Sequence, residues 1–209
     1  GVRKVRPAGW NKFNEDPISR INKSKNSGYY FGMPFSGNKK VEVTAGNLEK
    51  RKANKKVNYV VPIKASLSQK LNNDKHFVSS FSNVYDGINI NFIDKAMSRT
   101  KEIVITKQPK DISADTELIF WEEYKIPADA VVIGNNGEEI NGIKNDEQGQ
   151  VSILMPTGEK FVISGAIIYD GTFKDLNDIE SRAETVKEIV EVDRANNKVR
   201  IGLKVPSDY

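Results

Sequence analysis

The sequence contains no cysteine and only one histidine, His76, among its 209 residues. Disulfides, thiolate zinc sites and cysteine nucleophiles are therefore excluded, and imidazole-based catalysis has a single candidate residue. No apolar run approaches the roughly 20 residues that cross a bilayer, and no charged-then-apolar leader stands at the beginning. We therefore expect a soluble protein, in the cytoplasm or in a particle, with no membrane partner.

Several catalytic motifs are also missing. The sequence has no G-x-x-x-x-G-K-[ST], G-x-G-x-x-G, G-x-S-x-G or H-E-x-x-H, the local sequences of phosphate loops, dinucleotide turns, serine-hydrolase elbows and zincin helices. The carboxylates that do cluster are Glu122–Glu123, Asp146–Glu147 and a group in 175–180. Adjacent carboxylates in a strand point to opposite faces, and 175–180 lacks the spacing of an EF-hand loop. We expect no metal site, no cofactor and no catalytic residue.

Charge is divided unevenly along the chain. Residues 1–75 hold 17 Lys or Arg and 5 Asp or Glu, a net charge of +12, whereas residues 76–209 hold 15 and 23, a net charge of −8. Such asymmetry is typical of a basic segment that binds a polyanion or an acidic protein surface. The basic part of one copy could therefore lie on the acidic part of the next.

The first 39 residues are predicted to be an extended arm. They are rich in Gly, Pro, Asn, Ser and Lys and show no sustained helical or alternating period, so we expect them to be largely irregular. They also carry many large apolar side chains, which a free linker would not retain. The arm should therefore pack either on its own body or on a neighbouring subunit, which the sequence does not separate, and we favour the neighbouring subunit. The predicted contact residues are Arg3, Arg6, Trp10, Phe13, Tyr29, Tyr30, Phe31 and Phe35.

Residues 40–209 are predicted to form a β-rich body, with a sub-boundary near 125–130. Strands are indicated by stretches rich in Val, Ile, Phe, Trp and Tyr between turn-forming residues. These predicted strands are 41–43, 57–63, 77–81, 84–93, 102–106, 117–124, 130–133, 151–155, 160–163, 188–193 and 198–205. Residues 49–56 are predicted to form a basic loop, 65–73 a short helix, and 173–182 a loop or one helical turn.

The last of these strands has the clearest pattern. Val199, Ile201, Leu203 and Val205 alternate with polar residues and should face the core. No regular alternation of strands and helices supports a parallel sheet. The predicted fold is therefore mainly β, an antiparallel barrel or sandwich with an irregular N-terminal arm and one or two short helices.

Residues 92–124 carry the one resemblance to a known family. They run from Phe92-Ile93-Asp94 and Lys95 to a strand that contains Glu117-Leu118 and ends at Tyr124. This stretch resembles the C-terminal core of SET-domain methyltransferases, which passes from a Phe-Ile-Asn-His segment to a Glu-Leu-aromatic-Tyr strand. Asp94 and Lys95 replace the Asn-His pair that contacts that family's cofactor, and its Gly-rich motif is not evident upstream. The resemblance implies an S-adenosylmethionine-dependent enzyme.

Three functions remain open. We expect first a non-enzymatic structural or assembly protein, such as a capsid, neck or tail component of a virion, whose partners are copies of itself or other subunits. The second is a nucleic-acid-binding module in which a basic cluster binds phosphates. The third is a SET-like or carboxylate-dependent enzyme. The predicted phosphate-binding residues are Lys50, Arg51, Lys52, Lys55 and Lys56.

Overall fold

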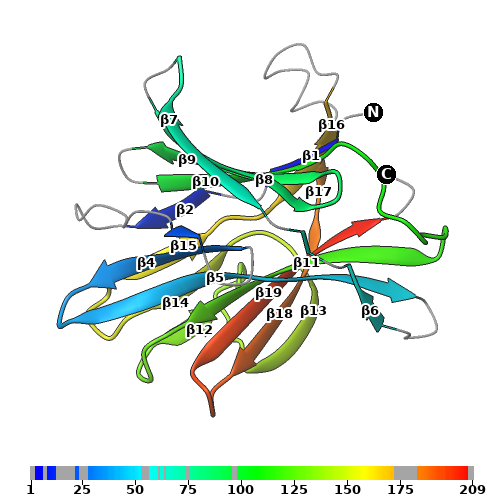
Figure 1. The fold of residues 1–209 in the computed structure, drawn as a ribbon. Helices are drawn as coiled ribbons and strands as arrows, with labels where there is room; N and C mark the ends of the chain where they lie inside the picture. The colour runs from blue at the N-terminus through cyan, green and yellow to red at the C-terminus, as the bar shows by residue number, and fades with distance from the viewer. Residues whose placement is uncertain are drawn as a thin grey trace.

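The chain forms two antiparallel β-sheets that enclose a common core (Figure 1). The computed structural model describes residues 3–6, 9–12, 22–23, 28–52, 57–60, 62–63, 65–73, 76–95, 98–171 and 183–206. These residues contain strands and turns but no helix, and so nothing among them forms a helix that would traverse a bilayer.

In the described residues, sheet A contains 11 strands and sheet B contains 8. The strands of sheet A are β1 (Arg3–Arg6), β2 (Gly9–Lys12), β7 (Ser66–Leu71), β8 (Phe77–Tyr85), β9 (Ile88–Lys95), β10 (Ser98–Ile105), β12 (Val131–Ile133), β14 (Val151–Leu154), β15 (Lys160–Ile163), β16 (Ile167–Asp170) and β17 (Glu184–Thr185). Those of sheet B are β3 (Asn22–Lys23), β4 (Tyr29–Phe35), β5 (Lys39–Lys52), β6 (Val57–Tyr59), β11 (Thr116–Lys125), β13 (Gly142–Glu147), β18 (Lys187–Asp193) and β19 (Lys198–Pro206).

Sheet A branches at β10. One edge of β10 pairs with β9 along its whole length, whereas the other edge pairs with β1 and β2 in turn. β1 continues the sheet to β16 and β17, and β2 continues it to β15, β14 and β12. The N-terminal strands therefore lie inside the sheet, between segments that follow them by about a hundred residues or more in the sequence.

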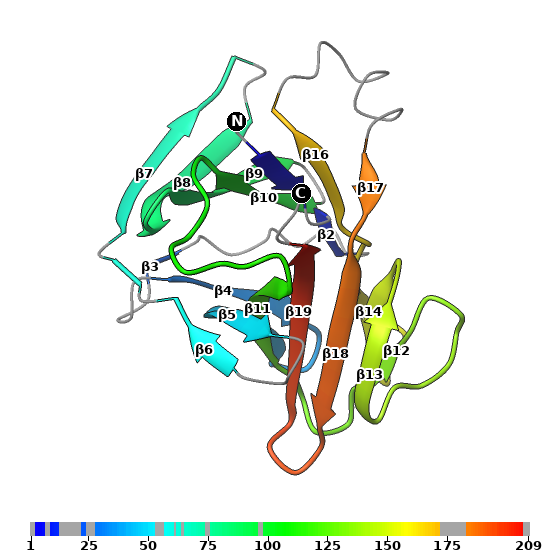
Figure 2. The same cartoon turned by 90° about the vertical axis from the view of Figure 1, so that its right-hand side faces the viewer.

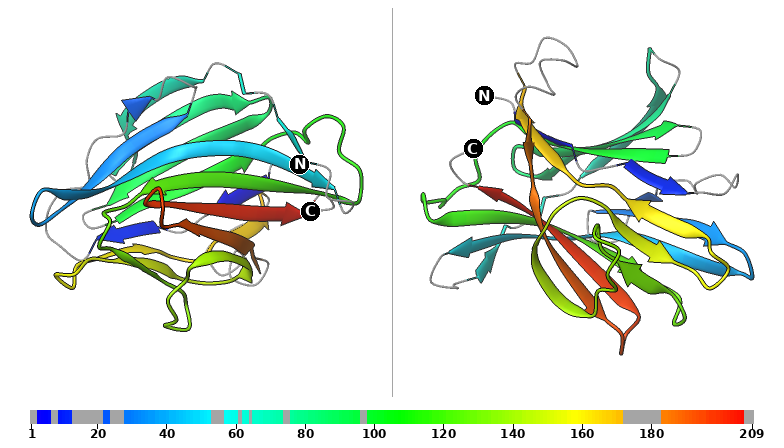
Figure 3. Two further views of the ribbon diagram at one scale, coloured as in Figure 1. Left: turned by 90° about the horizontal axis from the view of Figure 1, so that it is seen from below. Right: turned by 180° about the vertical axis from the view of Figure 1, so that it is seen from behind.

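Sheet B is built on three long neighbouring strands, β5, β11 and β19, which run side by side in the left view of Figure 3. Every pairing in the sheet is antiparallel. The sheet ends at β13 on one side. On the other side β5 pairs with β4 along its first half and with β6 along its second half. β6 and β13 lie at opposite sides of the molecule in Figure 2.

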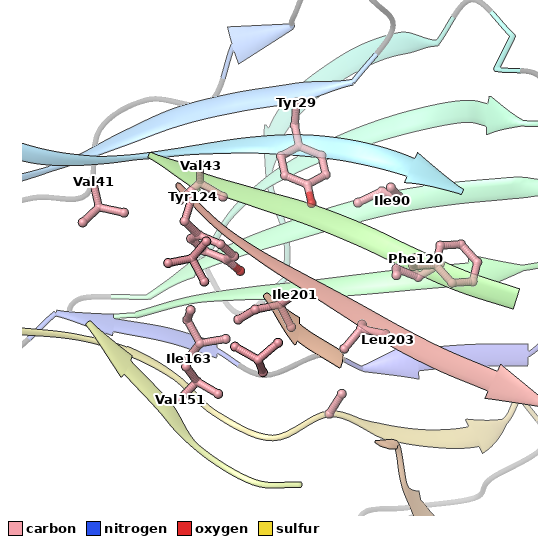
Figure 4. Packing of buried hydrophobic residues seen from close by; sticks show 14 of the residues in the cluster. Tyr29, Val41, Val43, Ile90, Phe120, Tyr124, Val151, Ile163, Ile201 and Leu203 are labelled. Carbon is pink, nitrogen blue, oxygen red and sulfur yellow. The ribbon is translucent and has the colours of Figure 1, made fainter. Parts of the chain in front are cut away.

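The core lies between the two sheets and is continuous. Figure 4 shows Ile90 of sheet A together with Phe120, Ile201 and Leu203 of sheet B in this interior layer. Alternation explains the arrangement, because every second residue of a strand points to the same face. A smaller apolar cluster of Ile119, Trp121 and Ile189 occupies the outer face of sheet B.

The structure confirms a mainly β fold and most of the predicted strands. The hairpins of 151–163 and 188–205 form as expected, with left-handed Gly158 and Asn197 in their turns. Val199, Ile201 and Leu203 face the core and are at most 5% exposed, and Val205 is buried with them. The strands of the described residues do not close into a barrel.

Three local predictions are wrong. Residues 66–71 form strand β7 and not a helix, because the four-residue spacing of Leu67 and Leu71 also places both on one face of a strand. Residues 49–52 continue strand β5, because β11 and β6 pair with both of its edges there. The parts of the arm that the structure describes are strands β1 to β4. The predicted segment 173–182 lies outside the described residues.

Candidate functional site

An ion pair crosses the core between the two sheets. Lys101 of β10 and Glu122 of β11 have side chains only 4% and 6% exposed, and their Nζ and Oε2 atoms are 3.0 Å apart. The hydroxyls of Tyr29 and Tyr124 donate to the two oxygens of Glu122, and Lys101 Nζ donates to the Tyr29 hydroxyl at 2.8 Å. Burial, and then the Glu122 carboxylate, raise the pKa of Tyr29 well above its ordinary value. The phenol therefore stays protonated and remains a donor.

A small cavity lies beside this network, beneath a β-bulge. Gly46 and Asn47 of β5 together oppose Trp121 of β11, and a Cβ on Gly46 would lie 2.7 Å from the Trp121 carbonyl oxygen. Lys101 and Tyr85 line the cavity, whose volume is about 20 Å³. This is room for a single water molecule, and a substrate would not fit.

A second buried cation lies on the same face of β10. The side chain of Arg99 is 1% exposed, and its Nε and Nη2 atoms donate to the two carboxylate oxygens of Asp94 at 2.5 and 3.0 Å. Its guanidinium stacks 4.5 Å from the centre of the Phe31 ring. Asp94, which occupies an Asn position in the methyltransferase resemblance, is thus engaged in a bidentate ion pair.

Two buried glutamates face each other across β13 and β18. Glu147 and Glu188 are register partners, only 7% and 2% exposed. Lys144 approaches Glu147 at 2.9 Å, whereas Oε2 of Glu188 has no hydrogen-bond partner among the described residues. Burial raises the pKa of Glu188 to about 8. The carboxylates of Glu147 and Glu122 also raise this pKa, whereas a hydrogen bond from the Ala166 backbone lowers it. Glu188 is therefore largely protonated at neutral pH.

The outer face of sheet B is covered by alternating charges. The Arg200 guanidinium lies 4.2 Å from the centre of the Trp121 ring, and Trp121 Nε1 donates to Glu49 at 2.6 Å. Arg51 binds the other oxygen of Glu49 at 2.9 Å, and Arg200 also binds Glu191 at 2.9 Å. These charge pairs cover the apolar Trp121 and form a polar surface around it.

The predicted arm residues do not gather into one site. Tyr29, Phe31 and Phe35 are at most 6% exposed and pack in the core of their own chain. Tyr30 is half-buried on the outer face, where its hydroxyl donates to Glu42 at 3.0 Å. Arg3 and Arg6 lie in β1 and Trp10 lies in β2, all within sheet A, and Phe13 lies outside the described residues.

The predicted phosphate-binding cluster is partly described. Lys50, Arg51 and Lys52 lie at the end of β5, all partly exposed, and Arg51 is paired with Glu49. Lys55 and Lys56 lie outside the described residues. The neighbouring β6 presents Tyr59, which is 56% exposed and is the register partner of Glu49.

Four of the five large apolar side chains that are exposed in the described residues lie on strands at sheet edges, and the fifth, Ile63, lies outside the strands. Val57 and Tyr59 lie on β6, Leu71 lies on β7, and Ile143 lies on β13; each of these strands pairs along only one edge in the described residues. Their exposed fractions range from 42% for Val57 to 68% for Ile143. An apolar side chain on an unpaired strand edge is a recognised site of association between chains.

Sequence reasoning missed both the buried ion pairs and the exposed edges. Arg99, Lys101, Ile103 and Ile105 occupy every second position of β10 and so share one face with each other. This two-residue period was the available signal that the two cations are buried. Their carboxylate partners come from other strands, so the pairs themselves required the structure.

No protein-family model, no curated protein and no solved structure matches the chain.

Proposed function

We propose that the chain is a non-enzymatic structural subunit that associates with other copies through the exposed edges of its sheets. The observation that carries the proposal is the position of the exposed apolar side chains. Val57, Tyr59, Leu71 and Ile143 all lie on strands with one unpaired edge among the described residues. Folded proteins generally protect such edges with charges, bulges or covering loops, because open edges pair with other chains.

The buried charges support a structural role. Lys101 and Glu122 bind each other and two tyrosine hydroxyls, so their hydrogen bonds join sheet A to sheet B. Breaking such a pair is costly because it leaves an uncompensated charge in the core. The adjacent cavity of about 20 Å³ has room for one water. The enzyme alternative remains a prediction without a supporting geometry in the described residues.

The arm contributes buried aromatic side chains to the core of its own chain and not to the proposed association surface. Tyr29, Phe31 and Phe35 are buried in their own chain, so they do not serve as an intermolecular strap in this structure. The opposite charges of the two parts of the sequence still favour contact between copies. The narrower expectation of a virion component stays a prediction.

Solution mass tests the proposal directly. Light scattering over a range of concentrations, with the ratio of absorbance at 260 and 280 nm, should show a mass that rises with concentration and no bound nucleic acid. A folded monomer at every concentration, free of nucleic acid, would overturn the proposal.

A nucleic-acid-binding module is the second candidate. The exposed Tyr59 ring lies on the same face of sheet B as Arg51 of the neighbouring strand, and an aromatic ring beside a cation suits stacking on bases and contact with phosphates. Binding of a single-stranded oligonucleotide should then weaken steeply with salt. The charge-removing variant Arg51→Gln should reduce the salt slope, whereas Lys187→Gln, at an exposed lysine on β18, serves as the control.

A further inference from the structure

The exposed apolar side chains at the two ends of sheet B lie on the same face of the sheet. Ile143 is the register partner of Glu191, which aligns with Arg200 on the outer face. Val57 and Tyr59 are the register partners of Arg51 and Glu49, which also lie on the outer face. The exposed apolar side chains at both ends therefore point to the same side of the sheet.

The two end strands, β6 and β13, also have the directions and the lengths that pairing between copies requires. Each step from β6 through β5, β11, β19 and β18 to β13 is antiparallel, so β6 and β13 run in opposite directions. A second copy placed beside the first in the same orientation would bring its β6 antiparallel to β13. A bulge at 145–146 limits the regular part of β13 to Gly142–Lys144, which equals the three residues of β6.

Charge favours the same contact. Residues 49–59, which contain the β6 end, hold five basic residues and one acidic residue, whereas residues 134–147, which contain the β13 end, hold four acidic residues and one basic residue. The antiparallel arrangement brings the end of β6 that begins at Val57 toward the 145–146 end of β13. Complementary charges of this kind select a partner and raise the association rate.

We propose that β13 of one copy pairs antiparallel with β6 of the next, so that sheet B continues from subunit to subunit. This inference rests on the proposed function and names its contact surface. Ile143 of one copy then lies opposite Val57 or Tyr59 of the other. A register shifted by one residue would place Ile143 on the opposite face from Val57 and Tyr59. The contact joins two different surfaces, so a pair of copies leaves one free end at each side and the same contact repeats from copy to copy.

Mixing two variants tests this contact. Ile143→Lys blocks the β13 end and Tyr59→Lys blocks the β6 end, and both sites are more than half exposed, so both variants should fold. In sedimentation velocity each variant alone should associate about tenfold more weakly than wild type or worse. An equimolar mixture retains one intact contact per pair, and should form dimers that grow no further. High salt should weaken association of the wild-type protein.

Ser36→Lys is the matched control, because Ser36 is exposed in the turn between β4 and β5 and lies on no strand edge. If the wild-type protein stays monomeric throughout, the proposed function fails. If it associates while Ile143→Lys and Tyr59→Lys associate equally well, only the β13–β6 contact fails. Variants that are blocked alone and do not dimerise when mixed would indicate a symmetric contact and would also overturn the inference.

Discussion

The buried carboxyl of Glu188 should make the protein less stable as the pH rises. Its pKa in the folded chain is about 8, against an ordinary value of 4.5. Between these values the folded state keeps a proton that the unfolded state has released. The unfolded state binds fewer protons there, so the free energy of unfolding falls with increasing pH. Below pH 4.5 the contribution is fully present, and above pH 8 it has been lost.

The size of the effect follows from the shift. Each pKa unit corresponds to about 1.4 kcal/mol, so the rise from 4.5 to about 8 amounts to about 5 kcal/mol over the whole window. Between pH 5 and pH 7 the expected loss is about 3 kcal/mol. For a chain of this length that loss lowers the melting temperature by roughly 5 to 10 °C.

The variant Glu188→Gln isolates this contribution from the other titrating groups. Urea unfolding at several pH values should give it nearly the stability of wild type at pH 5 and a clear advantage at pH 7.5. Glu184→Gln, an exposed carboxylate on β17, is the control and should follow the wild-type curve. A difference between Glu188→Gln and wild type that stays constant from pH 5 to pH 8 would refute the reasoning, because Glu188 would then titrate equally in both states.

Three further variants test the core, each by urea unfolding. Lys101→Met should cost about 3–5 kcal/mol, because it leaves the carboxylate of Glu122 buried without its cation, and an unchanged stability would show that the ion pair is not formed in solution. Gly46→Ala should cost about 1–3 kcal/mol, because its Cβ would contact the backbone of β11, and a neutral result would contradict the bulge. Phe31→Ala should cost about 3–5 kcal/mol, because Phe31 is buried in the core. Tyr59→Ala, at an exposed site, is its control and should change the stability by no more than about 0.5 kcal/mol. Equal effects would contradict the burial of Phe31.

The strands that the sequence predicts best are those with one clean apolar face. β19 alternates without interruption, and its partner β18 precedes it by a short polar turn, so both elements and their pairing follow from local pattern. The misread segment 66–71 is ambiguous for a physical reason. Leu67 and Leu71 are four residues apart, a spacing that suits one face of a helix and one face of a strand equally.

The segment 29–35 shows a different difficulty. Tyr29, Phe31, Met33 and Phe35 alternate as a strand requires, but Pro34 and nearby glycines suggested irregular structure. β3 reaches only the first two residues of β4, and no other described strand pairs with that edge of β4, so Pro34 lies in an edge position, where proline is tolerated. The strand assignment thus depended on the position of β4 in the sheet.

The candidate sites were the least predictable part. A lysine and an arginine on the buried face of β10 look like surface residues in a sequence, because their partners come from β9 and β11. The edge surfaces depend on strand order, since β6 and β13 are separated by more than 80 residues and become the two ends of one sheet only in the folded chain. Both features arise from tertiary structure and have no local pattern of their own.

The insertion of β1 into sheet A determines when the protein can fold. β1 pairs with residues 103–105 on one edge and with residues 167–170 on the other, so it leaves the ribosome long before either of its partners. Closing such long loops is slow, and unpaired strands remain exposed meanwhile. During synthesis sheet A therefore stays incomplete until residue 170 has emerged. The nascent chain should depend until then on chaperones that shield its unpaired strands.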